Sequence, residues 1–454
     1  MSKKYHLIGI GGISMSGIAQ LLLKRGDSVS GSDVKDSQLL ECLRQEGARI
    51  HIGHASANVN GADVVVYSSA IKEQNPELAA ARQKSIPVLK RGQALAELMQ
   101  DKKVVTVTGS HGKTTTTSLI SYMLLEASLS PTIAIGGTLK NIQANASHGQ
   151  GEFFVAEADE SDGSFLYYHP LYSIITNIDR EHLDYYRDFK NELKAFKAFI
   201  SQTQLEGCAF LCGDDENLRD IARDLAMKRV MFGLQKEHAD IYAQNIQMRG
   251  LASSFDVYYG ETLVSRFDLA LGGLHNVSNS LAVIALGLEL GIPVETIKKV
   301  LSSYKGAGRR LDVRLQDERV TVIDDYGHHP TEVKATLSAV KNMSATRVRA
   351  VFQPHRYSRT QLLLEEFGGC FTDADDVVIT DIYAAGEEEV IGVTGQSIVE
   401  AVKRHDPSRK ALYVPRQQLV QYLTSTIQPG EVLVMLGAGD IVKLSHELVE
   451  AVKH

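Results

Sequence analysis

The sequence lacks several features that would place it in a specialised class of protein. It has only four cysteines in 454 residues, and Cys42, Cys208, Cys212 and Cys370 form no CxxC pair. That number is too small for a disulfide framework in a chain of this length, so a reducing, cytoplasmic compartment is expected. The absence of low-complexity stretches and of a fixed short repeat argues against disorder and against a solenoid.

The sequence also has no excess of positive charge and no long apolar run. Its formal net charge is -7 with scattered basic residues, so no nucleic-acid partner is expected and an anionic ligand must be bound locally. The apolar stretch 281–292 contains Glu289 and is far shorter than the roughly 20 residues of a spanning helix. The N-terminus lacks the apolar core of a signal peptide. We therefore expect neither membrane insertion nor secretion.

The sequence does have a repeated alternation of short β-rich runs and helical patterns. This alternation predicts an α/β protein with parallel sheets, and the length favours three domains. The runs SSFDVYYG and VSRFDLA alternate polar and apolar residues and predict an antiparallel addition to the second domain. Helices are predicted at 15–24, 187–203, 276–290 and 294–303, and the predicted domains are 1–101, 102–310 and 311–454.

The strongest local motif is TGSHGKTT at 108–115, between the apolar strand VVTV and a helix. Backbone N–H groups and the helix dipole bind phosphate oxygens at such a helix start. Lys113 is expected to reach the terminal phosphates of ATP and Thr114 to face a magnesium ion. Val107 stands where the first glycine of the usual loop is expected, so the loop is a shortened variant; the alternative is a plain glycine turn. The central domain is therefore predicted to be of the P-loop ATPase type, with an ATP site at Gly109, Ser110, His111, Gly112, Lys113, Thr114 and Thr115.

The first glycine loop along the chain, GIGGISMSG at 9–17, follows the first strand, and Asp33 ends the next strand. This pattern resembles a dinucleotide fingerprint and predicts a Rossmann-like first domain. Ser14 occupies the position of the third glycine, which weakens a nicotinamide interpretation. The loop could equally bind a UDP diphosphate, because a helix N-terminus responds to negative charge and not to the base. A tight turn without a ligand is the remaining alternative.

Acidic residues follow the strands of the central domain. Glu157 ends the apolar run FFVAE, and a magnesium ion needs hard oxygen ligands of this kind. Asp159, Glu160 and Asp162 crowd the same turn, where some of them would be merely solvated or capping. His182 follows the next strand, at an expected carboxyl edge of the sheet, where α/β proteins bind ligands. His182 could also be an ordinary polar histidine.

With these residues in view, the whole chain resembles the Mur ligase family. The resemblance rests on GIGGISMSGIA, TGSHGKTTTT, AEADESDGSF, TNIDREHLDYY, GLHNVSN, GAGRRLD, DDYGHHPTEV, FQPHRYSRT and DIYAAGEE, in the family's order. It implies a magnesium-dependent and ATP-dependent ligase of peptidoglycan precursor synthesis, on which cell-wall biogenesis, cell shape and division depend. The implied substrates are UDP-N-acetylmuramate and L-alanine. ATP would convert the lactyl carboxylate into an acyl phosphate, which the amino group of L-alanine would attack.

The resemblance also implies roles for residues that local patterns do not assign, and a Rossmann-like third domain. The implied magnesium ligands are Thr114, Glu157 and His182, and His275, Asn276, Arg310 and Asp325 would complete the ATP site. Catalytic contributions are expected from Lys113, Glu157, His182, Asp325 and His328. The UDP sugar would bind at Gly11, Gly12, Ser14, Met15, Ser16, Asp33, Ser68, Ser69 and Ala70. The amino acid would bind at Tyr326, His328, His355, Arg356 and Arg359, with Arg359 and His355 on its carboxylate. For the basic residues of QPHRYSR, a solvated helix start is the alternative.

Three other functions fit parts of the sequence. A nicotinamide-dependent dehydrogenase fits the first glycine loop but has no need of the second. A nucleotide-switch protein would bind ATP without consuming it in ligation. Within the family, a recycling ligase attaches a preformed tripeptide to the same sugar nucleotide. The motifs GIGGISMS, HHPTEV and DIYAAGEE favour the alanine-adding activity.

Overall fold

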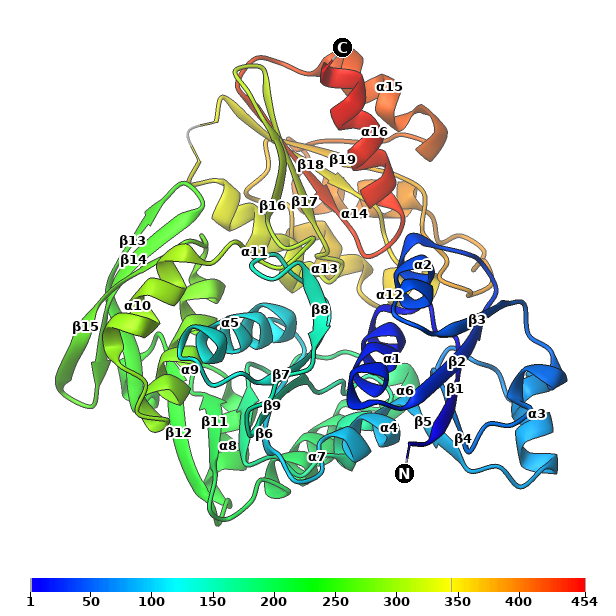
Figure 1. The fold of residues 1–454 in the computed structure, drawn as a ribbon. Helices are drawn as coiled ribbons and strands as arrows, with labels where there is room; N and C mark the ends of the chain where they lie inside the picture. The colour runs from blue at the N-terminus through cyan, green and yellow to red at the C-terminus, as the bar shows by residue number, and fades with distance from the viewer. Residues whose placement is uncertain (1, 344, 454) are drawn as a thin grey trace. The chain divides into compact units, whose positions relative to one another are not determined.

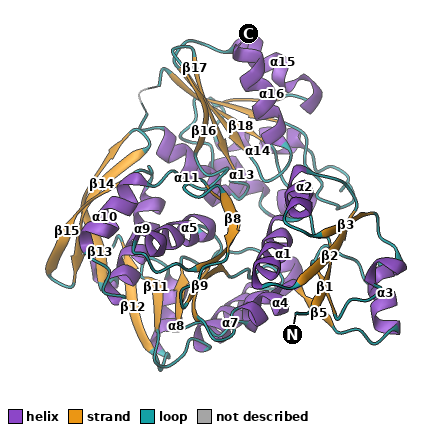
Figure 2. Cartoon of the chain, in the orientation of Figure 1, coloured by secondary structure: helices purple, strands orange, loops and turns teal. Residues whose placement is uncertain are grey.

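The computed structural model describes residues 2–343 and 345–453, which form two compact units (Figure 1). The first unit comprises residues 2–244, 256–267 and 278–305, and the second comprises 245–255, 268–277 and 306–453. Helices flank three sheets of five, ten and six strands (Figure 2). The predicted three-domain α/β architecture is therefore confirmed.

The five-stranded sheet is entirely parallel, with the order β3-β2-β1-β4-β5. Its strands are β1 (Lys4–Ile8), β2 (Ser28–Asp33), β3 (Arg49–Ile52), β4 (Val64–Tyr67) and β5 (Val88–Lys90). Its helices are α1 (Ile13–Arg25), α2 (Gln38–Gln45), α3 (Pro76–Gln83) and α4 (Arg91–Leu98). The chain order reverses between β1 and β4. Open α/β sheets bind ligands outside the carboxyl ends of the strands at such a reversal.

Helix α1 shows how the predicted pattern becomes packing. Met15, Ile18, Ala19 and Leu22 recur at helical spacing and are all buried. Gly26 ends the helix in the left-handed region, with a φ of +95°. The helix begins at Ile13, within the segment 9–17, and its buried face fixes that loop to the sheet.

The ten-stranded sheet has the order β15-β14-β13-β12-β11-β10-β6-β9-β7-β8. Its strands are β6 (Lys103–Thr108), β7 (Thr132–Leu139), β8 (Ala144–Ser147), β9 (Phe153–Glu157), β10 (Tyr172–Ile175), β11 (Cys208–Cys212), β12 (Lys228–Gly233), β13 (Ile241–Arg249), β14 (Ala252–Tyr259) and β15 (Thr262–Leu269). Strands β7, β9, β6, β10, β11 and β12 are parallel to their neighbours in this row. Turns of two residues join β13, β14 and β15, which requires antiparallel hairpins and matches the predicted addition.

The helices associated with this sheet include those predicted from periodicity. They are α5 (Lys113–Glu126), α6 (Leu183–Tyr186), α7 (Phe189–Ser201), α8 (Glu216–Arg223), α9 (Leu274–Glu289) and α10 (Val294–Ser303). The predicted helices 187–203, 276–290 and 294–303 correspond to α7, α9 and α10. Asp188 caps α7 by accepting a hydrogen bond from the backbone N–H of Asn191, which explains why this helix begins where it does.

The six-stranded sheet has the order β16-β17-β21-β18-β19-β20, with β16 antiparallel at the edge. Its strands are β16 (Asp312–Gln316), β17 (Val320–Asp325), β18 (Arg347–Phe352), β19 (Asp376–Ile379), β20 (Lys410–Tyr413) and β21 (Glu431–Leu436). Its helices are α11 (Pro330–Val340), α12 (Tyr357–Leu362), α13 (Leu364–Gly369), α14 (Gly395–His405), α15 (Arg416–Thr426) and α16 (Ile441–Lys453).

Alternating residues of β18 contribute to two separate apolar cores. Ala350 and Phe352 pack in one core, whereas Val351 packs in the other. Helices therefore bury both faces of the sheet, which explains the continuous apolar run VLVML in the central strand β21.

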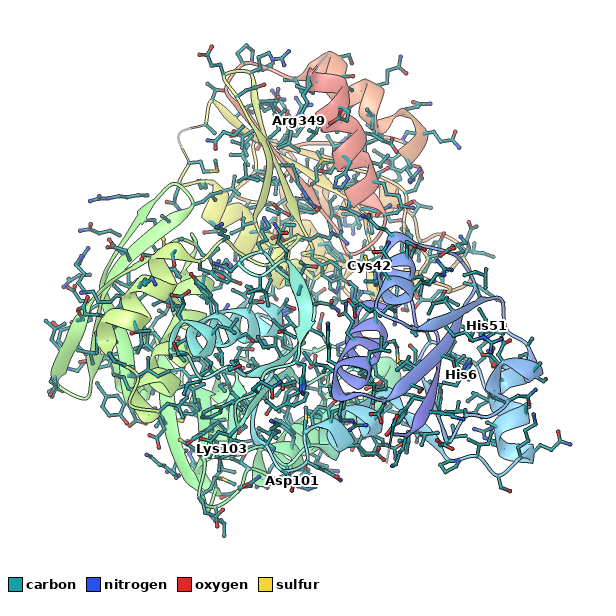
Figure 3. The ribbon with its side chains drawn as sticks, viewed as in Figure 1. His6, Cys42, His51, Asp101, Lys103 and Arg349 are labelled. Carbon is teal, nitrogen blue, oxygen red and sulfur yellow. The ribbon has the colours of Figure 1, made fainter. Side chains whose placement is uncertain are left out.

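The structure bears on the expected lack of membrane insertion and on the state of the cysteines. In the described part of the chain, no helix combines the length and apolar character that a membrane crossing requires. All four cysteines are free thiols; Cys42 is exposed (Figure 3), and the other three are buried.

Candidate functional site

The phosphate loop lies between β6 and α5, and its two glycines are required by its geometry. Gly109 and Gly112 have φ values of +124° and +85°, in the region that favours glycine. A Cβ on Gly109 would lie 2.3 Å from the hydroxyl oxygen of Thr176, and one on Gly112 would lie 2.7 Å from the amide oxygen of Asn279. The loop is therefore packed too closely for any side chain at these positions.

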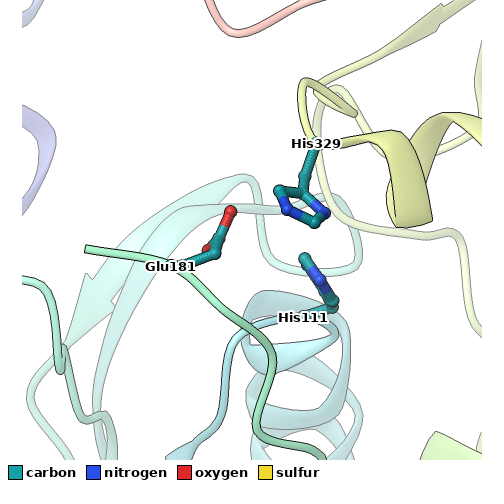
Figure 4. A group of neighbouring side chains, drawn as sticks. All are labelled: His111, Glu181 and His329. Carbon is teal, nitrogen blue, oxygen red and sulfur yellow. The ribbon is translucent and has the colours of Figure 1, made fainter. Parts of the chain in front are cut away.

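The turn after β10 braces this loop. The backbone N–H groups of Ser110 and His111 donate to the backbone and side-chain oxygens of Asn177, at 3.1 and 2.8 Å. The backbone N–H of Asp179 donates to Ser110 Oγ at 2.7 Å, and Asp179 Oδ2 lies 3.0 Å from His111 Nε2. Figure 4 shows His111 with Glu181 of the same turn. The predicted phosphate loop and the predicted NIDREHLD segment are thus parts of one site.

Lys113 is held at the start of α5 as a partly buried cation. Its Nζ donates to the carbonyl oxygens of Gly109 and Ser110 and to Glu160 Oε1, which is 2.6 Å away. Burial alone would lower the pKa of Lys113, but the charge and hydrogen bond of Glu160 outweigh it and raise the pKa above its usual value. The ammonium group is therefore charged at neutral pH and able to neutralise a phosphate.

Glu160, Glu181 and His182 form a cluster that could hold a divalent cation. One ligand atom from each lies within 4.8 Å of those of the other two. His182 Nε2 is 3.5 Å from Glu160 Oε1 and 3.6 Å from Glu181 Oε2. Two carboxylates and one imidazole, with Glu160 fully buried, suit a cation that prefers oxygen ligands.

Glu157 and Thr114 form a separate group beside Lys113. Glu157 ends β9, and its Oε2 accepts a hydrogen bond from the backbone N–H of Gly136 at 3.2 Å. Burial raises the pKa of Glu157, although the charge of Lys113 and the hydroxyl of Thr114 act in the opposite direction. The three predicted magnesium ligands thus fall into two groups, Thr114 with Glu157 and His182 with Glu160 and Glu181.

A small cavity brings the first glycine loop to these acids. Its lining includes Ser14, Gly17 and Ile18 from α1, Arg91 from α4, and Gly136, Glu157 and Asp159 from the central sheet. Arg91 Nη2 donates to Asp159 Oδ2 at 2.8 Å and to Ser164 Oγ at 3.3 Å. The cavity is therefore lined by charged groups of both signs, and it opens beside the carboxylate that contacts the phosphate loop.

The first glycine loop is fixed by the end of β2. Asp33 Oδ2 accepts a hydrogen bond from the backbone N–H of Gly11 at 2.9 Å, and a Cβ on Gly11 would lie 2.8 Å from that oxygen. The carbonyl of Ser32 accepts from the N–H groups of Gly9 and Ile10 at 2.8 and 3.1 Å. Asp33 therefore holds the loop, which explains its predicted association with it.

The other predicted residues of the sugar-nucleotide site differ in accessibility. Gly12, Ser14, Ser69 and Ala70 are exposed, and Gly11 and Ser68 are partly exposed. Ser68 Oγ accepts from the backbone N–H of Ala70 at 3.4 Å, within the turn that follows β4. Met15 and Ser16 are buried, and Ser16 Oγ donates to the carbonyl of Ile13 at 2.8 Å. Met15 and Ser16 thus pack α1 onto its sheet.

In the second unit, two histidines and two tyrosines cluster beyond the carboxyl ends of β17, β18 and β19. The ring of His355 lies 5.7 Å from that of His328 and is stacked at 5.7 Å on that of Tyr383. Tyr326 meets His328 edge to face at 5.4 Å. Arg359 Nη1 lies 3.1 Å from His355 Nδ1 and donates to it. The predicted amino-acid residues Tyr326, His328, His355 and Arg359 are therefore brought together.

The basic groups of this cluster keep His355 neutral. Burial and the positive charges of His328, Arg359 and Arg356 lower the pKa of His355 to about 3. The predicted residue Arg356 precedes α12 with a φ of +70°, and its backbone N–H donates to the carbonyl of Tyr383 at 2.9 Å. A neutral His355 can accept from Arg359 and hold its guanidinium in place.

The remaining predicted ATP residues in the second unit have structural partners there. Asp325 accepts hydrogen bonds from the N–H groups of Leu311 and Gly327, each at 2.8 Å, and from Thr336 at 3.2 Å. Burial raises the pKa of Asp325. The guanidinium of Arg310 lies 5.1 Å from the ring centroid of Tyr326.

His275 and Asn276 lie in the first turn of α9. Asn276 is buried, and its amide donates to the carbonyl of Gly272 at 2.8 Å. His275 is partly exposed, and a Cβ on Gly273 would lie 2.6 Å from its ring. Both residues are thus tied to the glycine turn that begins the helix.

Five residues of the groups described above have no role assigned from the sequence: Arg91, Glu160, Glu181, Asn279 and Tyr383. Glu160, Glu181 and Asn279 lie within the recognised motifs AEADESDGSF, TNIDREHLDYY and GLHNVSN, and Tyr383 lies within DIYAAGEE. Their side chains were not singled out because only the fold shows which member of each motif faces the site. Arg91 lies outside every recognised motif and carried no local signal.

Comparisons with known proteins agree with this geometry. The descriptions "Mur ligase family, catalytic domain", "Mur ligase middle domain" and "Mur ligase, glutamate ligase domain" match residues 4–103, 107–287 and 309–439. A UDP-N-acetylmuramate–L-alanine ligase from Desulfatibacillum aliphaticivorans is 46% identical over 98% of both chains. One from Geotalea uraniireducens is 44% identical over 99% of this chain and 98% of its own.

Solved structures show the same architecture. The UDP-N-acetylmuramate–alanine ligase MurC from Thermotoga maritima has a TM-score of 0.85 at 28% identity and covers 99% of both chains. A murein peptide ligase from Psychrobacter arcticus has a TM-score of 0.74 at 23% identity, again over 99% of both chains, which shows the shared fold. With three family descriptions matched in order and relatives aligned along nearly its whole length, the chain belongs to the Mur ligase family.

Proposed function

We propose that this protein joins L-alanine to UDP-N-acetylmuramate, with cleavage of ATP to ADP and phosphate, in the cytoplasmic synthesis of peptidoglycan precursors. One observation carries the proposal. A single cavity is lined by Ser14 of the sugar-nucleotide loop and by Glu157, which contacts Thr114 of the phosphate loop. A carboxylate of a bound sugar nucleotide could therefore meet a terminal phosphate. The names of the relatives at 44 to 46% identity support the choice of substrates.

The domain roles follow from this arrangement. We assign residues 1–101 to UDP-N-acetylmuramate binding, 102–310 to ATP binding and 311–454 to amino-acid binding. The sugar nucleotide occupies the loop of Gly11, Gly12 and Ser14 with the turn of Ser68, Ser69 and Ala70, and its diphosphate meets the start of α1. The three matched family descriptions divide the chain at similar places, which supports these boundaries.

The acidic groups around Lys113 fit Mg²⁺. Thr114 and Glu157 would hold one ion against the phosphates, and His182 with Glu160 and Glu181 would hold a second. Buried or partly buried carboxylate, hydroxyl and imidazole groups beside a phosphate loop are a suitable donor set for this ion. Bound Mg²⁺ supplies neutralisation of the charge that develops on the transferred phosphoryl group.

The reaction runs in two steps. A lactyl carboxylate oxygen attacks the γ-phosphorus of ATP and ADP leaves, which gives an acyl phosphate. The amino group of L-alanine then attacks the acyl carbon, and phosphate leaves with the original carboxylate oxygen. Lys113 and the loop N–H groups stabilise the phosphoryl oxygens, because their charge and orientation are fixed before the reaction. Exclusion of water from the cavity protects the acyl phosphate.

The amino-acid site lies in the His328, His355 and Arg359 cluster. Arg359 binds the alanine carboxylate, since a guanidinium can pair both oxygens, and His355 orients it by accepting one of its N–H groups. Tyr326 and His328 border the same cluster. Arg310, Asp325, His275 and Asn276 are proposed to complete the nucleotide site; the hydrogen bonds of Asp325 to Leu311 and Gly327 hold the segment that carries Arg310.

Release of phosphate from ATP tests the proposal. Purified protein with Mg²⁺, ATP and UDP-N-acetylmuramate is given L-alanine, the tripeptide L-Ala-γ-D-Glu-meso-diaminopimelate, or no acceptor. We expect release only with L-alanine and a product heavier by one alanine residue in the mass spectrum. Release that depends on the tripeptide would move the protein to the recycling branch of the family. A lack of release with every acceptor would contradict the ligase assignment.

A further inference from the structure

A buried carboxylate behind the sugar-nucleotide loop has no part in the chemistry described above. Glu77 lies in the first turn of α3 and is completely buried. An isolated buried carboxylate is costly, so a protein keeps one only where donors surround it. Glu77 has such donors from three other segments of the first domain.

Each oxygen of Glu77 has its own set of partners. Oε2 accepts from Ser32 Oγ at 2.6 Å and lies 3.1 Å from His54 Nδ1. Oε1 accepts from Asn58 Nδ2 at 2.5 Å and from the backbone N–H of Ala55 at 3.3 Å. The carboxylate therefore ties the end of β2 to the turn that follows β3.

A further histidine, His6, lies near the same carboxylate and beside His51. His6 Nε2 lies 3.8 Å from Glu77 Oε2, and His6 Nδ1 lies 2.9 Å from Ser30 Oγ. His6 and His51 are neighbours in the same domain (Figure 3), with ring centroids 6.3 Å apart. Burial would raise the pKa of Glu77, but the nearby ring of His6 and the hydrogen bonds from Ser32 and Asn58 lower it to about 2. Glu77 is thus ionised throughout the physiological range.

The network reaches the sugar-nucleotide loop through Ser32. The side chain of Ser32 is fixed by Glu77, while its carbonyl accepts the N–H groups of Gly9 and Ile10. The next residue, Asp33, accepts the N–H of Gly11 through its side chain, and its carbonyl accepts the N–H of Gly53, beside His54. Any movement of Ser32 must therefore move the glycine loop.

We propose that Glu77 is a positioning residue for the UDP-sugar site: it holds Ser32 and Asp33, which bind the N–H groups of Gly9, Ile10 and Gly11, so that the loop places the start of α1 at the diphosphate. This inference rests on the proposed function, which places the sugar nucleotide at that loop. Glu77 itself makes no contact with the substrate in this role. Its effect is on the affinity for the sugar nucleotide and not on the chemical step.

The isosteric variant Glu77→Gln tests this role. A glutamine can still accept from Asn58 and Ala55, but its NH₂ group would face the Ser32 hydroxyl and His54, where Glu77 accepts. We expect KM for UDP-N-acetylmuramate to rise on the order of tenfold, the usual cost of a lost hydrogen bond to a buried charge. The KM for ATP and for L-alanine should stay within about twofold of the wild-type values, because the network does not reach their sites.

Direct binding of UDP separates positioning from general destabilisation. By isothermal titration calorimetry, Glu77→Gln should weaken UDP binding by about the same factor as its KM rises. A variant that merely unfolds more easily would lower kcat for every substrate through loss of active protein, with KM unchanged. Glu73→Gln is the matched control, since Glu73 is exposed and pairs with Arg82 on the surface. It should leave UDP binding and all KM values unchanged.

Ser32→Ala provides a second variant, which removes one donor and leaves Asn58 and Ala55 on Glu77. It should weaken UDP binding in the same direction, and it decides the matter if Glu77→Gln does not fold. Unchanged UDP affinity in the folded variants, or an equal rise in KM for all three substrates, would overturn the positioning role. Wild-type protein that neither binds nor turns over UDP-N-acetylmuramate would instead contradict the proposed function itself.

Discussion

The ammonium group of Lys113 lies 2.6 Å from Glu160 Oε1, and the same oxygen lies 3.5 Å from Nε2 of His182. One buried carboxylate thus joins the phosphate-binding lysine to the candidate cation cluster. A terminal phosphate that binds Lys113 would share the positive charge of this lysine, which Glu160 neutralises in the structure described here. We therefore expect phosphate binding and cation binding to favour each other at this site.

Lys113→Ala should reduce the rate of ligation at least about a hundredfold, because it removes a fixed positive charge from the phosphoryl oxygens. UDP binding, measured by calorimetry, should stay unchanged, since the sugar-nucleotide loop lies in a different domain. Lys103→Ala is the control, because Lys103 is exposed and pairs with Glu152 at the other end of β6. Ligation at the wild-type rate by Lys113→Ala would contradict the assignment of the phosphate loop.

Glu160→Gln should raise the Mg²⁺ concentration needed for half-maximal rate by roughly tenfold, because one anionic ligand is lost from the cluster with His182 and Glu181. A titration of the rate with Mg²⁺ at saturating ATP measures this. Glu152→Gln, a change on the surface, should leave the titration unchanged. A lower kcat with an unaltered Mg²⁺ requirement would mean that Glu160 serves Lys113 alone and is no cation ligand.

Arg359→Ala should raise KM for L-alanine by roughly tenfold to a hundredfold, the cost of losing charged hydrogen bonds to a carboxylate. The KM for ATP should change little. Steady-state rates with each substrate varied in turn give both values. Arg404→Ala, which removes an exposed partner of Glu365, is the control. An equal rise for ATP and L-alanine would instead indicate that Arg359 acts in the assembly of the whole site.

Glu77 should make the free energy of unfolding depend on pH in the acidic range. Its pKa is lowered from 4.5 to about 2 in the folded protein, so between these values the unfolded chain binds a proton that the folded chain does not. The stabilisation that this carboxylate provides is thus fully present above about pH 4.5 and is lost as the pH falls toward 2. The shift corresponds to an upper bound of ~3 kcal/mol in the free energy of unfolding.

Urea denaturation of wild type and Glu77→Gln between pH 2.5 and 6 measures this contribution. Acid effects shared by both proteins cancel in the difference between their free energies of unfolding. We expect that difference to be largest at pH 6 and to shrink steadily on acidification. A difference that does not change with pH would show that Glu77 is not ionised at a depressed pKa in the folded state.

Much of the fold could be predicted because the signals for it lie within short stretches of the sequence. The apolar spacing of Met15, Ile18 and Leu22 marks α1, and the continuous apolar run VLVML of β21 marks a strand buried on both faces. The position of Lys113 directly after a strand and a glycine pair marks the phosphate loop. In each case, neighbours along the chain carry the whole signal.

The rest depends on residues that meet only in the folded chain. Edge strand β16 is not predicted, because its run DVRLQ is only five residues long and directly follows the glycine- and arginine-rich segment KGAGRR, which indicates a loop. The partnership of Lys113 with Glu160 spans 47 positions, and that of Ser32 with Glu77 spans 45. The predicted ligands Thr114, Glu157 and His182 could not be sorted into two groups, because their separation depends on which way each side chain leaves its turn.

The transfer of a carboxylate oxygen to phosphate tests the central claim most directly. UDP-N-acetylmuramate labelled with ¹⁸O in both lactyl carboxylate oxygens is converted with ATP, Mg²⁺ and L-alanine, and the released phosphate is analysed by mass spectrometry. If the reaction passes through an acyl phosphate at the phosphate loop, each phosphate should carry one ¹⁸O and each amide should retain the other. Phosphate without label, formed while the amide is made, would contradict the account.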